Sequence, residues 1–82
     1  MAGMSELILY STPGCHLCEL AEAEVDAVIT QGPWRLREVD ITDDQELMRR
    51  YGVRIPVLFD PTNQRELSWP FDRYGVERFL QS

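Results

Sequence analysis

The sequence has 82 residues, 44% of them hydrophobic and 27% charged, and its formal net charge is −6. This length suits one small domain with one core, so we expect a single domain over residues 1–82. Fourteen acidic residues against eight arginines and no lysine argue against binding to nucleic acids or to anionic membranes. No segment approaches the roughly 20 apolar residues of a membrane-spanning helix. Residues 1–5 contain neither the basic region nor the apolar core of a secretory signal.

The two cysteines, Cys15 and Cys18, lie between two regular segments. The apolar run over residues 7–11 is typical of a strand that is buried on both faces. Residues 15–30 carry an apolar face at three- and four-residue spacing, which predicts an amphipathic helix. That face consists of Cys18, Ala21, Val25, Val28 and Ile29. Gln31-Gly32-Pro33 should end this helix, because glycine suits a helix cap and proline cannot continue the helix.

The middle of the sequence predicts an edge strand followed by a short helix. Residues 34–41 alternate between polar and apolar only in part, which is typical of a strand at the edge of a sheet. Thr42, with Gln45 three residues later, matches a capping box and predicts the start of a helix. This helix should end at Gly52, with a buried stripe made of Leu47, Met48 and Tyr51.

The last third predicts a hairpin and a final helix. Residues 53–60 lead into a third strand, residues 61–64 have the composition of a turn, and residues 65–69 return as a fourth strand. Asp72 suits the N-cap of the last helix, whose buried face should consist of Val76, Phe79 and Leu80.

The order of elements is then β-α-β-α-β-β-α. The first strand–helix–strand unit predicts a parallel pair with a right-handed crossover. The closing hairpin makes the four-stranded sheet mixed, and helices on both faces give a three-layer α/β/α sandwich.

The position of the cysteine pair predicts redox chemistry. A cysteine at a strand-to-helix turn is exposed and lies near the unpaired N–H groups of the first helical turn, which stabilise a thiolate. We therefore expect Cys15 to attack a disulfide and Cys18, one turn further along, to resolve the mixed disulfide. A lone cysteine pair in this context also favours a cytoplasmic location, where structural disulfides are rare.

Three other interpretations of the pair stay open. Zinc usually takes four ligands, and this chain offers only the two thiols and His16. A metal cluster shared between two chains could use two such pairs. The cysteines could also be inert core residues, which suits Cys18 on the apolar face better than Cys15. We expect no bound metal or cofactor.

Two features beside the pair are candidates for substrate binding. His16, the only histidine, either stabilises a Cys15 thiolate when protonated or simply faces solvent at the helix start. Ile55-Pro56 comes before a buried strand, where the missing N–H of proline costs nothing. The functional interpretation is a cis bond that exposes the Ile55 backbone beside Cys15, so that an extended substrate segment could pair with it.

Several motifs together resemble the thioredoxin superfamily. They are Cys15-His16-Leu17-Cys18 after a strand, Arg54-Ile55-Pro56-Val57 after the second helix, and the closing hairpin and helix. Residues 13–18 and 67–72 are similar to a set of small bacterial glutaredoxin-like proteins. The resemblance covers nearly the whole chain. It implies a thioredoxin-like fold, with Cys15 as nucleophile, Cys18 as resolving thiol and Pro56 as a cis-proline facing them.

The resemblance also implies that glutathione could bind to this protein. Glutaredoxins hold it partly through a Gly-Gly-x-Asp segment at the start of the last helix, and only Asp72 of this chain matches that segment. The other interpretation, which we favour, is that Asp72 is a plain helix cap. Arg49, Arg50 and Arg54 could attract a glutathione carboxylate or form a solvated face. Well-characterised glutaredoxins have proline where this chain has His16.

These features predict a glutaredoxin-like thiol-disulfide oxidoreductase for redox homeostasis or for electron transfer to a protein or low-molecular-weight disulfide. Its catalytic residues are Cys15 and Cys18, its substrate-binding residues are Ile55, Pro56, His16 and Arg54, and glutathione is a possible reductant. The alternative is a non-catalytic thioredoxin-fold module that binds a protein partner, glutathione or a shared metal cluster. We expect a monomer whose partner is a disulfide-containing protein or glutathione, and neither nucleic acid nor membrane.

Overall fold

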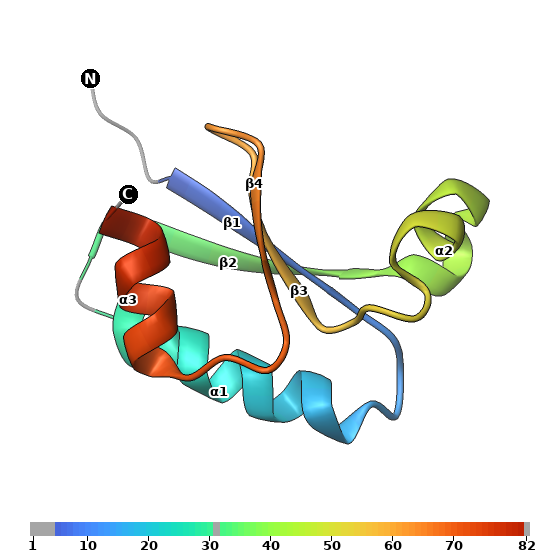
Figure 1. Ribbon diagram of the computed structural model, residues 1–82, viewed down its shortest axis with the longest axis horizontal. Helices are drawn as coiled ribbons and strands as arrows, with labels where there is room; N and C mark the ends of the chain where they lie inside the picture. The colour runs from blue at the N-terminus through green and yellow to red at the C-terminus, as the bar shows by residue number, and fades with distance from the viewer. Residues whose placement is uncertain (1–4, 31, 82) are drawn as a thin grey trace.

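A computed structural model describes residues 5–30 and 32–81 of the chain. The elements in chain order are β1 (Ser5–Ser11), α1 (His16–Ile29), β2 (Trp34–Asp40), a short 3₁₀ turn η1 (Ile41–Asp43), α2 (Gln45–Tyr51), β3 (Val57–Asp60), β4 (Arg65–Ser68) and α3 (Arg73–Gln81) (Figure 1). The predicted order β-α-β-α-β-β-α is therefore confirmed. Gln31, part of the predicted end of the first helix, lies outside the described residues.

The four strands form one mixed sheet in the order β2-β1-β3-β4. β1 pairs parallel to β2 and antiparallel to β3, and β3 and β4 form the antiparallel hairpin. The first strand lies inside the sheet, between β2 and β3, and its residues 7–11 are therefore all buried. The partly alternating β2 lies at an edge, as its sequence pattern predicts.

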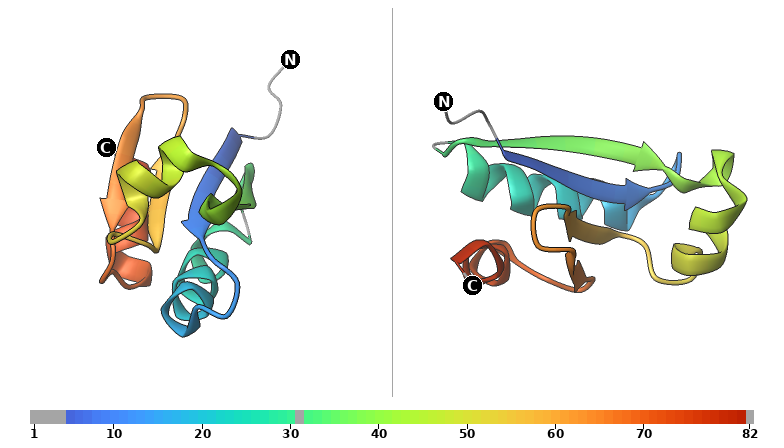
Figure 2. Two further views of the ribbon diagram at one scale, coloured as in Figure 1. Left: turned by 90° about the vertical axis from the view of Figure 1, so that its right-hand side faces the viewer. Right: turned by 90° about the horizontal axis from the view of Figure 1, so that it is seen from above.

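Helices cover both faces of β1. Leu7 and Leu9 pack with residues of α1 and α3, whereas Ile8 and Tyr10 pack with Tyr51 of α2. Side chains alternate across a strand, so these two sets point to opposite faces of the sheet. Figures 1 and 2 show α1 and α3 together on one side and α2 towards the end where β1 and β2 finish. The predicted three-layer arrangement is confirmed.

The second helix differs from its prediction in two ways. Its N-cap is Asp44, whose Oδ1 accepts hydrogen bonds from the N–H groups of Glu46 (2.8 Å) and Leu47 (3.2 Å). Thr42 belongs to η1, where its N–H donates to Asp40 Oδ1 (2.9 Å), so the Thr42 capping box is wrong. Met48 is exposed, because a helix of seven residues turns only its last residue, Tyr51, fully into the core. Gly52 caps the helix as predicted.

The other boundaries shift by a few residues. Cys15 and Thr30 are the caps of α1 rather than members of it. β3 begins only at Val57, and Val53 is fully exposed in the segment before it. In α3, Val76 and Phe79 are buried, while Leu80 is partly buried against the same core.

Candidate active site

A four-residue turn joins the buried end of β1 to the start of α1. Gly14 has a φ of 74°, a left-handed conformation that glycine adopts without steric cost. This turn places Cys15 at the N-cap of α1. The motif therefore sits where a rigid central strand meets a helix N-terminus, which fixes the direction of its first sulfur.

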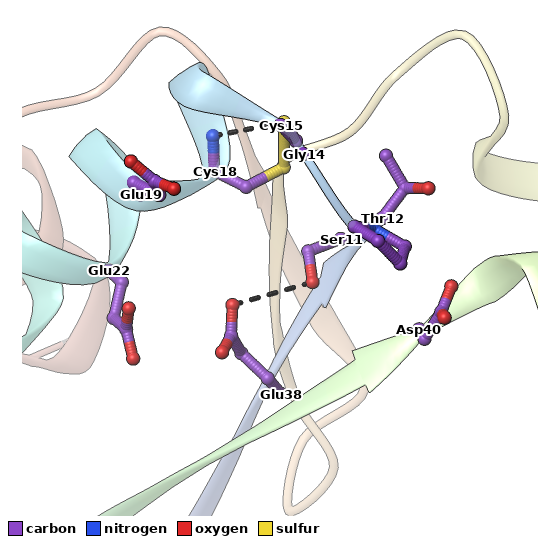
Figure 3. A pocket seen from close by; sticks show the side chains of 10 residues that line it. Ser11, Thr12, Gly14, Cys15, Cys18, Glu19, Glu22, Glu38 and Asp40 are labelled. Carbon is purple, nitrogen blue, oxygen red and sulfur yellow. Dashed lines mark hydrogen bonds between the residues drawn. A yellow bond between two sulfur atoms is a disulfide. The ribbon is translucent and has the colours of Figure 1, made fainter.

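Cys15 and Cys18 form a disulfide, and their Cα atoms are 5.2 Å apart. Cys15 Sγ also accepts a hydrogen bond from the Cys18 backbone N–H, with 3.1 Å between nitrogen and sulfur (Figure 3). Cys15 is half-buried, whereas Cys18 is only 2% exposed. An attacking partner can therefore reach Cys15 far more easily than Cys18, and a reduced Cys15 would keep a donor aimed at its sulfur.

Ile55 and Pro56 lie at the same end of the sheet as the disulfide. Val57 pairs with Tyr10, so Pro56 comes directly before the point where β3 meets β1. The Ile55–Pro56 peptide bond is cis, as the resemblance implies, and so is Trp69–Pro70, which the sequence did not predict. The Ile55 N–H donates to the Tyr51 carbonyl (3.1 Å). The Ile55 N–H is therefore already paired, and pairing of a substrate segment with the Ile55 backbone stays a prediction.

His16 is the first residue of α1, and its side chain is 78% exposed. Its Nδ1 lies 3.9 Å from Glu19 Oε1, one turn further along the same helix. This position suits the solvent-facing interpretation, with a weak exposed ion pair when the imidazole is protonated.

The predicted anion-binding arginines are already paired with carboxylates. Arg54 Nη2 donates to Glu66 Oε1 (2.7 Å). Arg49 and Arg50 both donate to Glu46 on the exposed side of α2, at 2.7 and 3.3 Å. Binding of a glutathione carboxylate by any of them would require an exchange of partners, and a role of Arg54 in substrate binding stays a prediction.

Asp72 has the contacts of a helix cap. Its Oδ1 accepts a hydrogen bond from the Gly75 N–H (2.9 Å), and its carbonyl accepts one from Val76 (3.0 Å). Both contacts satisfy N–H groups in the first turn of α3 that would otherwise lack partners. These contacts support the interpretation of Asp72 as a helix cap.

An acidic hollow of about 410 Å³ opens beside the disulfide, between α1 and the end of β2 (Figure 3). Both cysteines line it together with four carboxylates, which belong to Glu19, Glu22, Glu38 and Asp40. None of the described residues that line it is basic. Ser11 at its floor donates a hydrogen bond to Glu38 Oε2 (3.4 Å). The acidic hollow therefore places negative charge beside the disulfide.

The carboxylates of the acidic hollow affect one another. Burial raises the pKa of Glu22, and the neighbouring carboxylates of Glu38, Asp26 and Glu19 raise it further. At Asp40 the hydroxyl and N–H of Thr42 donate hydrogen bonds, which lower its pKa and keep it ionised. Crowded negative charge of this kind disfavours a further anion in the same space.

Glu38 and Asp40 are site residues that the sequence prediction missed. The parallel register pairs Ser11 with Asp40 and Leu9 with Glu38, so the polar end of β2 lies beside the strand that leads to the cysteines. The signal was present, because the predicted parallel pair already required the ends of the two strands to meet at one edge of the sheet.

The ionisation of the Tyr51 phenol depends on its burial and on its hydrogen bond to Glu66. Its O–H donates to Glu66 Oε2 (2.5 Å), and burial together with this hydrogen bond raises the pKa of Tyr51 from 10.0 to about 12. The stability from this raised pKa is present in full below about pH 10 and is lost as the pH rises towards 12. We expect Tyr51→Phe to remove a tyrosinate absorbance change centred near pH 12. A change that instead disappears near pH 10 would contradict the hydrogen-bonded environment.

The fold and the cysteine pair define a thioredoxin-superfamily domain of the redox type. The chain belongs to the glutaredoxin-like domain family (DUF836), which matches residues 6–81. The crystal structure of target protein XcR50 from X. campestris is 43% identical, covers 92% of this chain and 95% of that chain, and has a TM-score of 0.78. Family membership and the Cys15–Cys18 pair together support a redox role.

Two other solved structures extend the comparison. Protein Ne2328 from Nitrosomonas europaea is 28% identical, covers 96% of this chain and 94% of that chain, and has a TM-score of 0.79. A mutant thioredoxin from Halobacterium salinarum is 24% identical, covers 96% and 74% of the two chains, and has a TM-score of 0.70, so it shares the fold. A comparison with curated proteins gave no match.

Across residues 5–30 and 32–81, no three or more His, Cys, Asp or Glu side chains are grouped so that they could hold a metal ion. No helix in the described part of the chain is both long and apolar enough to cross a membrane.

Proposed function

We propose that this domain is a dithiol–disulfide oxidoreductase that reduces a disulfide in a protein substrate. The observation that supports this most is the unequal placement of the two sulfurs, with Cys15 half-exposed at a helix N-cap and Cys18 buried behind it. A reactive thiolate must be accessible and close to N–H donors, whereas a resolving thiol only needs to reach its partner.

The proposed reaction starts from the reduced pair. The Cys15 thiolate attacks one sulfur of the substrate disulfide, forms a mixed disulfide and releases the other substrate sulfur as a thiolate that takes up a proton. Cys18 then loses its proton, attacks Cys15 Sγ and displaces the second substrate thiolate. Formation of the Cys15–Cys18 disulfide oxidises the pair by two electrons, which pass to the substrate. The second substrate thiolate takes up a proton, so the substrate ends as two thiols.

The electrostatics of the site favour a protein substrate over oxidised glutathione. Four carboxylates of the acidic hollow lie beside the disulfide, and the carboxylates of oxidised glutathione outnumber its amino groups. Leu17, between the two cysteines, is exposed and offers apolar contact to a larger partner. A low-molecular-weight thiol is the proposed source of electrons, in a monomer working in the cytoplasm.

The test compares wild type with Cys15→Ser in the reduction of insulin disulfides, with dithiothreitol or glutathione as donor. We expect Cys15→Ser to lose catalysis by on the order of 10³-fold, because a serine hydroxyl is a poor nucleophile at neutral pH. Equal rates for the two proteins would end this proposal and favour a non-catalytic binding module of the same fold.

Neutralising the acidic hollow should make oxidised glutathione a better substrate. The pair Glu22→Gln and Glu38→Gln removes two negative charges beside the sulfurs, so the rate with oxidised glutathione should rise roughly 3- to 10-fold at low ionic strength. A control with Asp43→Asn and Glu77→Gln removes the same charge from exposed positions outside the acidic hollow. A rise of equal size in both pairs would mean that net charge, rather than this site, sets the rate.

A further inference from the structure

Tyr51 connects β1, the strand that leads to the cysteines, to the segment before Pro56. It is the last residue of α2 and is only 2% exposed. Its ring stacks on Tyr10 of β1, with centroids 4.3 Å apart and an interplanar angle of 17°. Its carbonyl accepts hydrogen bonds from the N–H groups of Arg54 (2.8 Å) and Ile55 (3.1 Å). The position of residues 54–56 relative to β1 therefore depends on where Tyr51 is held.

Glu66 of β4 holds both Tyr51 and Arg54 through one carboxylate. Its Oε2 accepts the hydrogen bond from the Tyr51 O–H (2.5 Å), and its Oε1 accepts one from Arg54 Nη2 (2.7 Å). The Arg54 guanidinium also lies over the Tyr51 ring, 5.2 Å from its centroid, and reaches Ser68 Oγ at 3.4 Å. Two charge-assisted contacts on one side chain fix two residues of the same short segment.

Partial burial makes these contacts stronger than an ordinary surface pair. The Glu66 side chain is 28% exposed and that of Arg54 is 39% exposed. Glu6 provides a useful contrast, because its carboxylate also pairs with an arginine, Arg37 at 3.3 Å, but the side chains are 43% and 57% exposed. More exposed ion pairs contribute little to holding a side chain in one geometry.

We propose that Glu66 is a positioning residue that holds residues 54–56 in place for the binding of an extended substrate beside the disulfide. This rests on the proposed function, because it assigns to the segment a part in recognising that substrate. Glu66 itself does not touch the reacting sulfurs. Its effect should therefore appear in the binding of extended substrates and not in the intrinsic reactivity of Cys15.

The test uses Glu66→Gln, with Glu6→Gln as the control that removes one carboxylate from a more exposed ion pair. In Glu66→Gln we expect the KM for insulin to rise about 5-fold, because a neutral amide cannot replace both charge-assisted contacts. The alkylation rate of Cys15 by iodoacetamide, which needs no extended binding, should stay as in wild type. Glu6→Gln should change neither quantity.

Amide hydrogen exchange gives a readout that does not depend on turnover. We expect Glu66→Gln to speed exchange of the Arg54 and Ile55 amides relative to the Val76 amide of α3, which lies in the other core cluster. Unchanged exchange at both amides would overturn the positioning role, and so would faster exchange with an unchanged KM for insulin. If wild type reduces no disulfide, the proposed function fails, and exchange alone then decides whether Glu66 fixes this segment.

Discussion

Cys18→Ser is expected to stop the reaction half-way, with the protein covalently linked to its substrate. Cys15 can still attack the substrate disulfide, but no second thiol is present to displace it. Turnover of insulin should fall by on the order of 10²- to 10³-fold, and about one equivalent of mixed disulfide should accumulate. Non-reducing electrophoresis and mass spectrometry of the intact adduct measure both the amount and the linked residue.

The control for this experiment is Cys15→Ser, which keeps the buried thiol and removes the accessible one. Cys18 is only 2% exposed, so this variant should form almost no adduct. An equal yield of adduct from the two variants would show that the roles of the two cysteines are not divided as proposed.

Leu9→Ala is expected to cause a large loss of stability. Leu9 is fully buried on the central strand and packs in the cluster that contains α1 and α3. Removing its side chain should lower the free energy of unfolding by about 2–5 kcal/mol, through lost burial and the cavity left behind. Urea titration of oxidised protein, with the Cys15–Cys18 disulfide intact in all variants, measures this directly.

Leu20→Ala is the matched control for Leu9→Ala. Leu20 is the same residue type on α1 but is 44% exposed, so its truncation should change the free energy of unfolding by no more than about 0.5 kcal/mol. Similar losses in the two variants would contradict the assignment of the core to this face of β1.

The elements with strong local signals were predictable from the sequence. The apolar run of β1 and the spaced apolar face of α1 each have a pattern that one structure explains best. These elements also led to the parallel pairing of the first two strands, which the structure confirms. The position of the cysteine pair at the strand-to-helix turn followed from the same two elements.

Features that depend on one-residue choices or on distant contacts were harder to predict. Thr42 and Asp44 are both good N-cap residues, and only the 3₁₀ turn at Ile41–Asp43 decides between them. Met48 lies on the predicted stripe, but the short helix leaves it exposed. The contact of Glu66 with Tyr51 joins residues that are 15 positions apart, which no local pattern reports.

The candidate site likewise has features that could be predicted from the sequence and features that could not. Cys15, Cys18 and the cis bond before Pro56 were expected from the motifs and the resemblance, and the structure places them at one end of the sheet. The carboxylates of Glu38 and Asp40 join the site only through the register of β2 against β1. The electrostatic character of the site therefore depends on strand pairing, which the motifs do not contain.

The central claim is that Cys15 is the reactive thiol, and its alkylation as a function of pH tests this most directly. Fully reduced protein is treated briefly with iodoacetamide at each pH, and the modified cysteine is identified by peptide mass spectrometry. Two influences oppose each other here, because the helix N-terminus favours a Cys15 thiolate and the acidic hollow disfavours it. Direct contact with the Cys18 N–H should decide the outcome in favour of the thiolate.

We expect Cys15 to be modified first and Cys18 to stay almost unmodified, with the pKa of the Cys15 thiol below the free value of about 8.5. In urea-unfolded protein both cysteines should react at similar rates. Modification of Cys18 first, or equal rates for the two cysteines in the folded protein, would contradict the account.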